Sequence, residues 1–256
     1  MSLLGSLFRN ALNTVSTHTK SKKRTLISHR FICASRLSKS DFWSHAPLGK
    51  SLSTLYNSEY CDFSIAYSFK DNICSYYNEF ISCADGEQIL IFVMDHIGVI
   101  DPSWKEKLDL ALGQFDLVGI RGNSKLTDEQ PTWWFETFTS EPNCLSGGAR
   151  LETVNGYAES NLGYSPLACK VLEPSFIAIR AKNLYNAEIY FDPDMGQSFF
   201  ALDFCRSAAL AGLSIGTWPI HIADACSLIT PSNYSENWSD YFLRYRAKWL
   251  VSDTPK

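Results

Sequence analysis

The run from Gln88 to His96 constrains the fold of this chain more than any other stretch of its sequence. Branched and aromatic side chains follow one another from Ile89 to Val93, and the run ends on Asp95 and His96. An apolar run of this length predicts a strand buried on both faces, as in the parallel sheets of α/β proteins. The carboxyl ends of such strands form the sheet edge where ligands bind. Asp95 and His96 are therefore the first candidate binding residues.

Strand and helix patterns alternate along most of the chain. Predicted strands cover residues 30–35, 62–67, 88–94, 115–120, 170–180 and 213–222, and predicted helices cover 41–55, 71–83, 101–112, 198–211 and 236–250. The alternation in the first half implies parallel strands joined by right-handed crossovers. Residues 123–170 have little periodicity, which predicts an irregular insertion with short strands.

The chain is long enough for one large α/β domain, which we assign to residues 28–256, behind a leader of residues 1–27. The charge is divided unevenly, because residues 1–50 hold nine Lys or Arg and one acidic residue, whereas the remainder holds 14 Lys or Arg and 26 Asp or Glu. In the leader, an apolar stripe at helical spacing precedes a basic cluster at residues 20–24. This pattern is typical of an amphipathic helix on an anionic membrane surface. A helix docked on the domain and a disordered leader are the alternatives.

The eight cysteines are spread singly, without a Cys-x-x-Cys pair, which argues against a zinc ribbon or a redox motif. Such unpaired cysteines fit a reduced compartment. No apolar run approaches the roughly 20 residues that a membrane span needs, and no secretory signal pattern is present. We therefore expect a cytoplasmic protein, with peripheral membrane contact through the leader as the alternative.

A series of short motifs follows in a fixed order between about residues 30 and 250. The motifs are Cys33-Ala-Ser-Arg36, Tyr77-Asn78-Glu79, the strand ending at Asp95, Asp101-Pro-Ser-Trp104, Phe115-Asp-Leu-Val-Gly119, Phe191-Asp-Pro-Asp194, Leu202-Asp-Phe-Cys-Arg206, Ala211-Gly-Leu-Ser-Ile-Gly216 and Lys248-Trp249. The series resembles the GT-A glycosyltransferases of the family 2 kind, in particular small single-domain bacterial glycosyltransferase-like proteins related to a streptomycin-biosynthesis protein. The resemblance implies a GT-A-like, Rossmann-type α/β domain with a mixed, mainly parallel sheet flanked by helices.

The resemblance also implies a metal site. In that family the third strand ends in an acidic pair that holds a divalent metal on the diphosphate of a nucleotide-sugar, and a late residue completes the site. The matching positions here are Asp95, His96 and Asp224, so an imidazole replaces one carboxylate. Carboxylate oxygens suit Mg²⁺ or Mn²⁺, and the nitrogen of His96 suits manganese better. His221, within a predicted strand, is a weaker candidate than Asp224.

Asp203 is the candidate general base, because the family carries an acidic motif before its late helix. A carboxylate can deprotonate an acceptor hydroxyl that it contacts directly. The family's usual form has two acids separated by one residue, and Ala201 stands here in place of the first. A structural role for Asp203, paired with Arg206 on the same helix, is the alternative.

The predicted nucleotide-binding residues lie on the first strand and the second helix. Ser35 and Arg36 end the first strand, where they suit recognition of a base or a phosphate, and Arg36 offers a bidentate fork. Asn78 is expected to bind the base or the ribose, and its alternative role is that of a polar residue on a helix face. Trp133 and Trp134 form either a stacking wall for sugars or a local hydrophobic cluster.

These observations predict a protein that binds a nucleotide-diphospho-sugar, most simply a UDP-sugar, and transfers the sugar to a hydroxyl of a glycan or lipid-linked acceptor in polysaccharide biosynthesis. A catalytically impaired nucleotide-sugar-binding protein of the same fold is the alternative. We expect no nucleic-acid partner, because the body of the chain is acidic whereas phosphate backbones attract cationic surfaces. A Rossmann oxidoreductase is disfavoured because no Gly-x-Gly-x-x-Gly follows the first strand.

Overall fold

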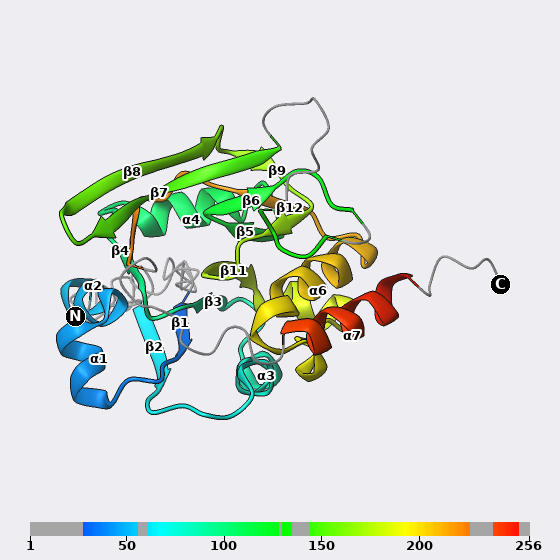
Figure 1. Ribbon diagram of the computed structural model, residues 1–256, viewed down its shortest axis with the longest axis horizontal. Helices are drawn as coiled ribbons and strands as arrows, with labels where there is room; N and C mark the ends of the chain where they lie inside the picture. The colour runs from blue at the N-terminus through cyan, green and yellow to red at the C-terminus, as the bar shows by residue number, and fades with distance from the viewer. Residues whose placement is uncertain (1–27, 56–60, 128–129, 135–143, 226–237, 251–256) are drawn as a thin grey trace, which may run out of the picture.

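The computed structural model describes residues 28–55, 61–127, 130–134, 144–225 and 238–250. Two sheets with helices around them make up this part of the chain (Figure 1). The predicted α/β class, with a mixed sheet flanked by helices, is confirmed. The predicted leader of residues 1–27 lies outside the described residues. Within the described residues, no helix is both long enough and apolar enough to cross a membrane.

The larger sheet has seven strands in the order β2-β1-β3-β11-β5-β12-β9. Their bounds are β1 (His29–Ala34), β2 (Cys61–Ala66), β3 (Ile89–Val93), β5 (Leu117–Gly119), β9 (Leu167–Ala168), β11 (Phe176–Arg180) and β12 (Ile215–Thr217). The three strands β2, β1 and β3 are parallel, as the alternating pattern predicted. Strand β11 runs antiparallel to both of its neighbours, β3 and β5, and makes the sheet mixed.

The order of the first three strands creates a topological switch point. Helices α1 (Lys39–His45) and α2 (Pro47–Leu55) lead from β1 to β2, and α3 (Ile73–Cys83) leads from β2 to β3. Because β1 lies between β2 and β3, the chain leaves β1 towards one side and returns on the other. The carboxyl ends of β1 and β3 therefore flank the place where open α/β sheets bind ligands.

Strand β3 is buried on both faces, as its sequence predicted, and each of its side chains is at most 1% exposed. Leu90 and Phe92 belong to the core cluster that contains buried residues of α3, α6 (Gly196–Leu210) and α7 (Trp238–Leu250). Ile91 and Val93 belong to the cluster on the other face, which contains buried residues of α1, α2 and α4 (Trp104–Ala111). The two clusters hold β3 rigidly, so the residues that follow it have a defined position.

The second sheet has the order β10-β6-β7-β13-β4, with β8 paired to β7. Its strands are β4 (Ile97–Val99), β6 (Arg121–Asn123), β7 (Leu145–Thr153), β8 (Gly156–Gly163), β10 (Val171–Leu172) and β13 (Ile222–Asp224). The irregular insertion expected over residues 123–170 therefore contains a long β-hairpin, β7–β8. Most side chains of β8 are exposed, so its sequence lacks the apolar alternation that identifies a half-buried strand.

Two predicted strands are each divided in the structure. The predicted strand 170–180 consists of β10 and β11, separated at Pro174, because proline lacks the N–H that a ladder needs. The predicted strand 213–222 consists of β12 and the start of β13, which lie in different sheets on the two sides of Pro219. Two short elements complete the described chain, α5 (Ala181–Ala187) and the 3-10 helix η1 (Pro193–Met195).

Candidate functional site

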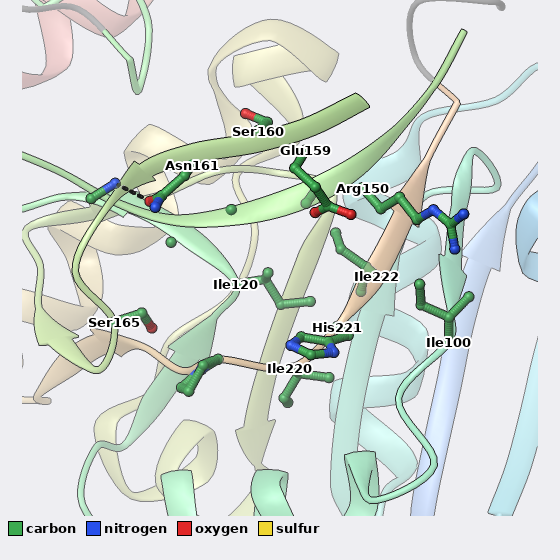
Figure 2. Close-up of a pocket in the computed structure, with 15 residues that line it drawn as sticks. Ile100, Ile120, Arg150, Glu159, Ser160, Asn161, Ser165, Ile220, His221 and Ile222 are labelled. Atoms are coloured by element: carbon green, nitrogen blue, oxygen red, sulfur yellow. Dashed lines mark hydrogen bonds between the residues drawn. The ribbon is translucent and has the colours of Figure 1, made fainter. Parts of the chain in front are cut away.

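One cavity of about 640 Å³ lies between the β7–β8 hairpin and the segment before β13 (Figure 2). Arg150 and Glu159, which face each other across the hairpin, line it together with the exposed His221. Four isoleucines supply apolar lining, namely Ile100, Ile120, Ile220 and Ile222. His221, the weaker metal candidate, is in this lining, whereas the other residues predicted to bind a ligand, all of which the structure describes, lie elsewhere. Because the titratable side chains converge at the switch point, we place the candidate site there.

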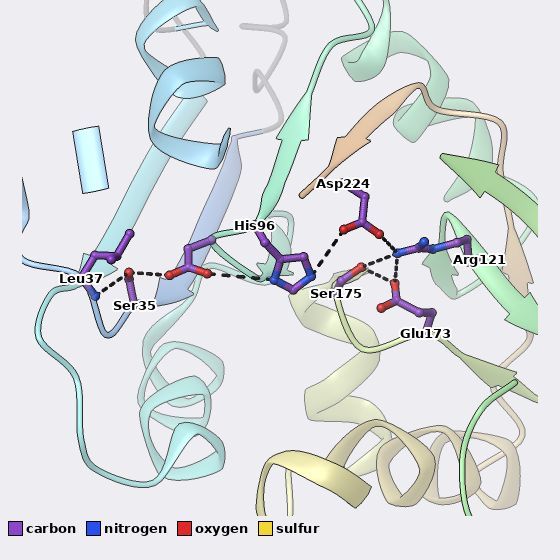
Figure 3. Close-up of polar contacts among 8 residues, drawn as sticks. Ser35, Leu37, His96, Arg121, Glu173, Ser175 and Asp224 are labelled. Atoms are coloured by element: carbon purple, nitrogen blue, oxygen red, sulfur yellow. Dashed lines mark hydrogen bonds and ion pairs between the residues drawn. The ribbon is translucent and has the colours of Figure 1, made fainter. Parts of the chain in front are cut away.

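A hydrogen bond joins the ends of β1 and β3 at the switch point (Figure 3). The hydroxyl of Ser35, which follows β1, donates to Oδ2 of Asp95 at 2.6 Å. The backbone N–H of Leu37 donates to the same hydroxyl at 3.2 Å and so orients it. Ser35 is 1% exposed, whereas the Asp95 side chain is 23% exposed. The buried serine therefore holds a carboxylate that solvent, and a ligand, can reach.

His96 lies between two carboxylates. Its Nδ1 is 4.0 Å from Oδ1 of Asp95, and its Nε2 is 4.0 Å from Oδ1 of Asp224 at the end of β13 (Figure 3). The structure thus brings together the three residues that were predicted as metal ligands, from both sheets.

The arrangement does not form a single three-ligand metal site. A metal ion binds one nitrogen of an imidazole, but the two carboxylates face different nitrogens of His96, across its ring. Oδ2 of Asp224 is also bound by Arg121. No group of three or more His, Cys, Asp or Glu residues in the described part of the chain could hold a metal ion. Binding of Mn²⁺ or Mg²⁺ stays a prediction. The three residues, as they are placed, do not fit such an ion.

Arg121, in β6, is the buried cation of this region. Its Nη2 lies 2.7 Å from Asp224 Oδ2, 3.3 Å from Glu173 Oε2 and 3.5 Å from Ser175 Oγ. Burial lowers the pKa of Arg121, but the attraction of Glu173 and Asp224 raises it by more, so that the net pKa lies above the ordinary value. The hydroxyl of Ser175 also donates to Glu173. The guanidinium is therefore charged and fixed between two carboxylates.

These side chains form one continuous polar row from β1 to the second sheet (Figure 3). In order, the polar row consists of Ser35, Asp95, His96, Asp224, Arg121, Glu173 and Ser175. Sequence analysis missed Arg121, Glu173 and Ser175. The sequence signal for these three residues was that each is charged or polar and lies in or beside a predicted strand. This pattern is too common to identify site residues.

Asn78 makes a reciprocal pair of hydrogen bonds with the backbone of Phe191. Its Nδ2 donates to the Phe191 carbonyl at 2.7 Å, and the Phe191 N–H donates to its Oδ1 at 2.9 Å. Both ends of the amide therefore tie α3 to the segment before η1. This geometry matches the structural alternative, and nucleotide binding by Asn78 stays a prediction. Arg36, by contrast, is exposed beside Ser35.

Asp203 is 0% exposed within α6. Its Oδ1 accepts hydrogen bonds from Trp249 Nε1 at 2.9 Å and from Lys248 Nζ at 2.7 Å, so its partners come from α7. Burial raises the pKa of Asp203 more than Lys248 and Trp249 lower it. The pKa of Lys248 is also raised, because Asp192 and Asp203 outweigh its burial. The pair is thus attractive, and the shift at Asp203 reflects its deeper burial. Its role as a base stays a prediction, because a base must contact the acceptor hydroxyl.

The two tryptophans predicted to form a stacking wall for sugars or a local hydrophobic cluster differ in burial. Trp133 is half-buried and packs against the core cluster that contains α3 and α6, which matches the local hydrophobic cluster. Trp134 beside it is 57% exposed and is the one that a sugar ring can reach.

No protein-family model and no curated protein matches the chain. The mannosyltransferase PcManGT from Pyrobaculum calidifontis, in complex with GDP-Man and Mn²⁺, has a TM-score of 0.49 and 9% identity, covering 90% of this chain and 66% of its own. GalNAc-T7 with UDP, GalNAc and Mn²⁺ has a TM-score of 0.48 and 9% identity, covering 79% and 44%. TarS 1–349 from S. aureus, in complex with UDP, has a TM-score of 0.44 and 13% identity, covering 90% and 67%. This chain thus spans less than half of GalNAc-T7 and about two thirds of the other two.

Proposed function

We propose that the protein binds a nucleotide-diphospho-sugar, most simply a UDP-sugar, at the carboxyl ends of β1 and β3. The observation that carries the proposal is the Ser35–Asp95 hydrogen bond across the topological switch point. Ligands of open α/β sheets bind at such a crevice, and nucleotides are common among them. The ordered motifs along the chain indicate the same ligand class.

Each residue near the crevice has a chemical role in this proposal. Asp95 accepts hydrogen bonds from hydroxyls of the ribose or the sugar, as acidic residues do in dinucleotide sites. The hydroxyl of Ser35 fixes that carboxylate, since it holds Oδ2 and leaves Oδ1 towards His96. The exposed guanidinium of Arg36 offers two parallel N–H donors to a phosphate oxygen pair.

Transfer of the sugar is the second part of the proposal. An acceptor hydroxyl attacks the anomeric carbon, a new carbon–oxygen bond forms, and the bond to the diphosphate breaks with its electron pair leaving on the phosphate oxygen. The hydroxyl proton passes to a base, for which Asp203 is the sequence candidate. The acceptor is a glycan or a lipid-linked glycan, and the expected compartment is the cytoplasm.

A binding protein without transfer is the competing function. It is favoured by the burial of Asp203 in an ion pair with Lys248, because a base in that position does not meet an acceptor. Turnover separates the two functions: release of UDP from a UDP-sugar in the presence of acceptor supports transfer, and binding of UDP without release supports the competing function.

Calorimetric titration with UDP tests the binding proposal directly. We expect saturable binding to the wild type, and a loss of about tenfold or more in affinity for Asp95→Ala, equivalent to roughly 1.4 kcal/mol. Asp62→Ala is the matched control, because Asp62 is an acidic residue of β2 with a side chain that is 60% exposed. The proposal fails if UDP does not bind the wild type, either with or without Mn²⁺.

A further inference from the structure

We propose that the imidazole of His96 fills the position between Asp95 and Asp224 that a divalent cation would need, and that this site therefore takes its ligand without a metal. The inference deepens the proposed function and rests on it. It follows from three features of the polar row.

The first feature is the position of the imidazole ring. Asp95 faces Nδ1 and Asp224 faces Nε2, each at 4.0 Å, so that the ring itself lies between the carboxylates (Figure 3). The His96 side chain is only 20% exposed. A metal shared by Asp95 and Asp224 would have to displace the ring from this place.

The second feature is that Asp224 already has a cation. Its side chain is 3% exposed, and its Oδ2 lies 2.7 Å from Nη2 of the buried Arg121. A guanidinium that is buried needs its anionic partners, because an uncompensated buried charge is strongly unfavourable. A metal that drew Asp224 away would leave Arg121 with Glu173 as its remaining carboxylate partner in the polar row.

The third feature is that the carboxylate of Asp95 already has partners in the protein. Its Oδ2 accepts the 2.6 Å hydrogen bond from Ser35, and its Oδ1 faces Nδ1 of His96, so each oxygen already has a partner in the polar row. Mn²⁺ and Mg²⁺ are held by several oxygen ligands. The carboxylates of Asp95 and Asp224 lie on opposite sides of the imidazole, so they do not present their oxygens to one common position.

Titration of the protein with Mn²⁺ alone tests the inference, with His96→Asp as the key variant. A carboxylate at residue 96 is shorter than an imidazole, so it both vacates the position and supplies oxygen ligands. We expect no saturation of the wild type up to about 1 mM Mn²⁺, the weak end of hard-cation sites. We expect His96→Asp to bind at least about 10–100-fold more tightly, the scale on which single ligand-shell changes act. His96→Asn is the matched control, because it also shortens the side chain but adds no carboxylate.

Saturable binding of Mn²⁺ to the wild type well below that concentration would overturn the inference, and so would a folded His96→Asp that gains no binding. Folding of each variant is checked by its thermal unfolding. Should His96→Asp fail to fold, titration of the wild type with UDP decides, once with Mn²⁺ and once with a chelator. Equal affinity in the two titrations supports the inference, and UDP binding that requires Mn²⁺ overturns it while leaving the proposed function in place. UDP binding in neither titration refutes the proposed function, and with it this inference.

Discussion

Ser35 and Asp95 are separated by 60 positions in the sequence, yet a 2.6 Å hydrogen bond joins their side chains at the switch point of the sheet. The bond depends on the parallel pairing of β1 with β3, which brings the ends of the two strands to one edge. A buried hydroxyl that holds an accessible carboxylate is a means of preorganising that carboxylate for a ligand.

Ser35→Ala should weaken UDP binding while leaving the fold intact. Loss of the hydroxyl removes one neutral-to-charged hydrogen bond that positions Asp95, and such bonds contribute about 1.5–3 kcal/mol. Since only part of this free energy affects ligand binding, we expect the Kd measured by calorimetry to rise by about three- to tenfold. Ser44→Ala, at an exposed serine of α1, is the control and should leave the Kd unchanged. Equal affinities of Ser35→Ala and wild type would contradict the role of the bond.

Arg121→Met should destabilise the protein strongly. The substitution leaves the buried carboxylates of Asp224 and Glu173 without their shared cation. Breaking a buried ion pair from one side costs about 3–5 kcal/mol, which urea unfolding measures. Lys182→Ala removes the exposed partner of Glu87 and should cost at most about 1 kcal/mol. A loss for Arg121→Met as small as that of the control would show that Arg121 is dispensable for folding.

Asn78→Ala should reduce stability without changing nucleotide affinity. The variant leaves the N–H and the carbonyl of Phe191 without the amide that pairs with both. An unsatisfied buried group costs about 1–3 kcal/mol, so the free energy of unfolding should fall by that amount. The Kd for UDP should stay within about twofold of the wild type, much less than the tenfold that 1.4 kcal/mol represents. A large rise in Kd with unchanged stability would restore the predicted role of Asn78 in the nucleotide site.

Asp203 should make stability fall as the pH rises above the ordinary range of aspartate. Burial raises the pKa of Asp203 in the folded protein, against the opposing effects of Lys248 and Trp249. The folded state therefore binds the proton more tightly than the unfolded chain, whose pKa is about 3.9. The contribution of Asp203 to the free energy of unfolding is complete below the pKa of the unfolded chain. It is lost as the pH rises through the raised pKa of the folded protein. The free energy of unfolding of the wild type, minus that of Asp203→Asn, should accordingly decrease from about pH 4 upward. Urea unfolding over a pH series measures this difference, and an increase with pH would contradict the assignment.

Gly147→Ala should be more destabilising than Gly156→Ala, although both glycines have positive φ angles. A Cβ on Gly147 would lie 1.8 Å from the carbonyl oxygen of Ile120, which blocks the pairing of β6 with β7. A Cβ on Gly156 would meet nothing within 4 Å, so only the backbone strain of a sparsely populated conformation remains, about 1–3 kcal/mol. Thermal unfolding compares the two variants, and equal losses would mean that the β6–β7 contact relaxes without cost.

Local signals in the sequence predicted most of the helices and the central strand. The polar side chain of Asn72 precedes an apolar helical pattern, and in the structure it caps α3 by accepting from the N–H groups of Cys74 and Ser75. Gly212 follows the predicted helix 198–211 and has a φ of 81°, the left-handed conformation that ends α6. These features depend on neighbours in the chain, which is why the sequence alone predicts them.

The long-range relationships could not be predicted in the same way. The sequence of β11 reads as a buried strand, but its antiparallel direction depends on the path of the chain through the second sheet. Asp95, His96 and Asp224 lie together, although not as a three-ligand metal site, whereas Asn78 and Asp203 are engaged by Phe191 and by Lys248. The sequence shows that a polar residue lies on a helix. It does not show which partner another part of the chain brings to that residue.

The placement of β11 between β3 and β5 has a consequence for synthesis of the chain. Strands β3 and β5 are complete by residue 119, but the strand that joins them begins at Phe176. Until β11 is made, one edge of each strand has unpaired backbone N–H and C=O groups, next to side chains that are wholly buried in the folded protein. Such an edge readily pairs with other chains. A nascent or truncated chain that stops before β11 should therefore aggregate, and the larger sheet is complete only after β12, which ends at Thr217.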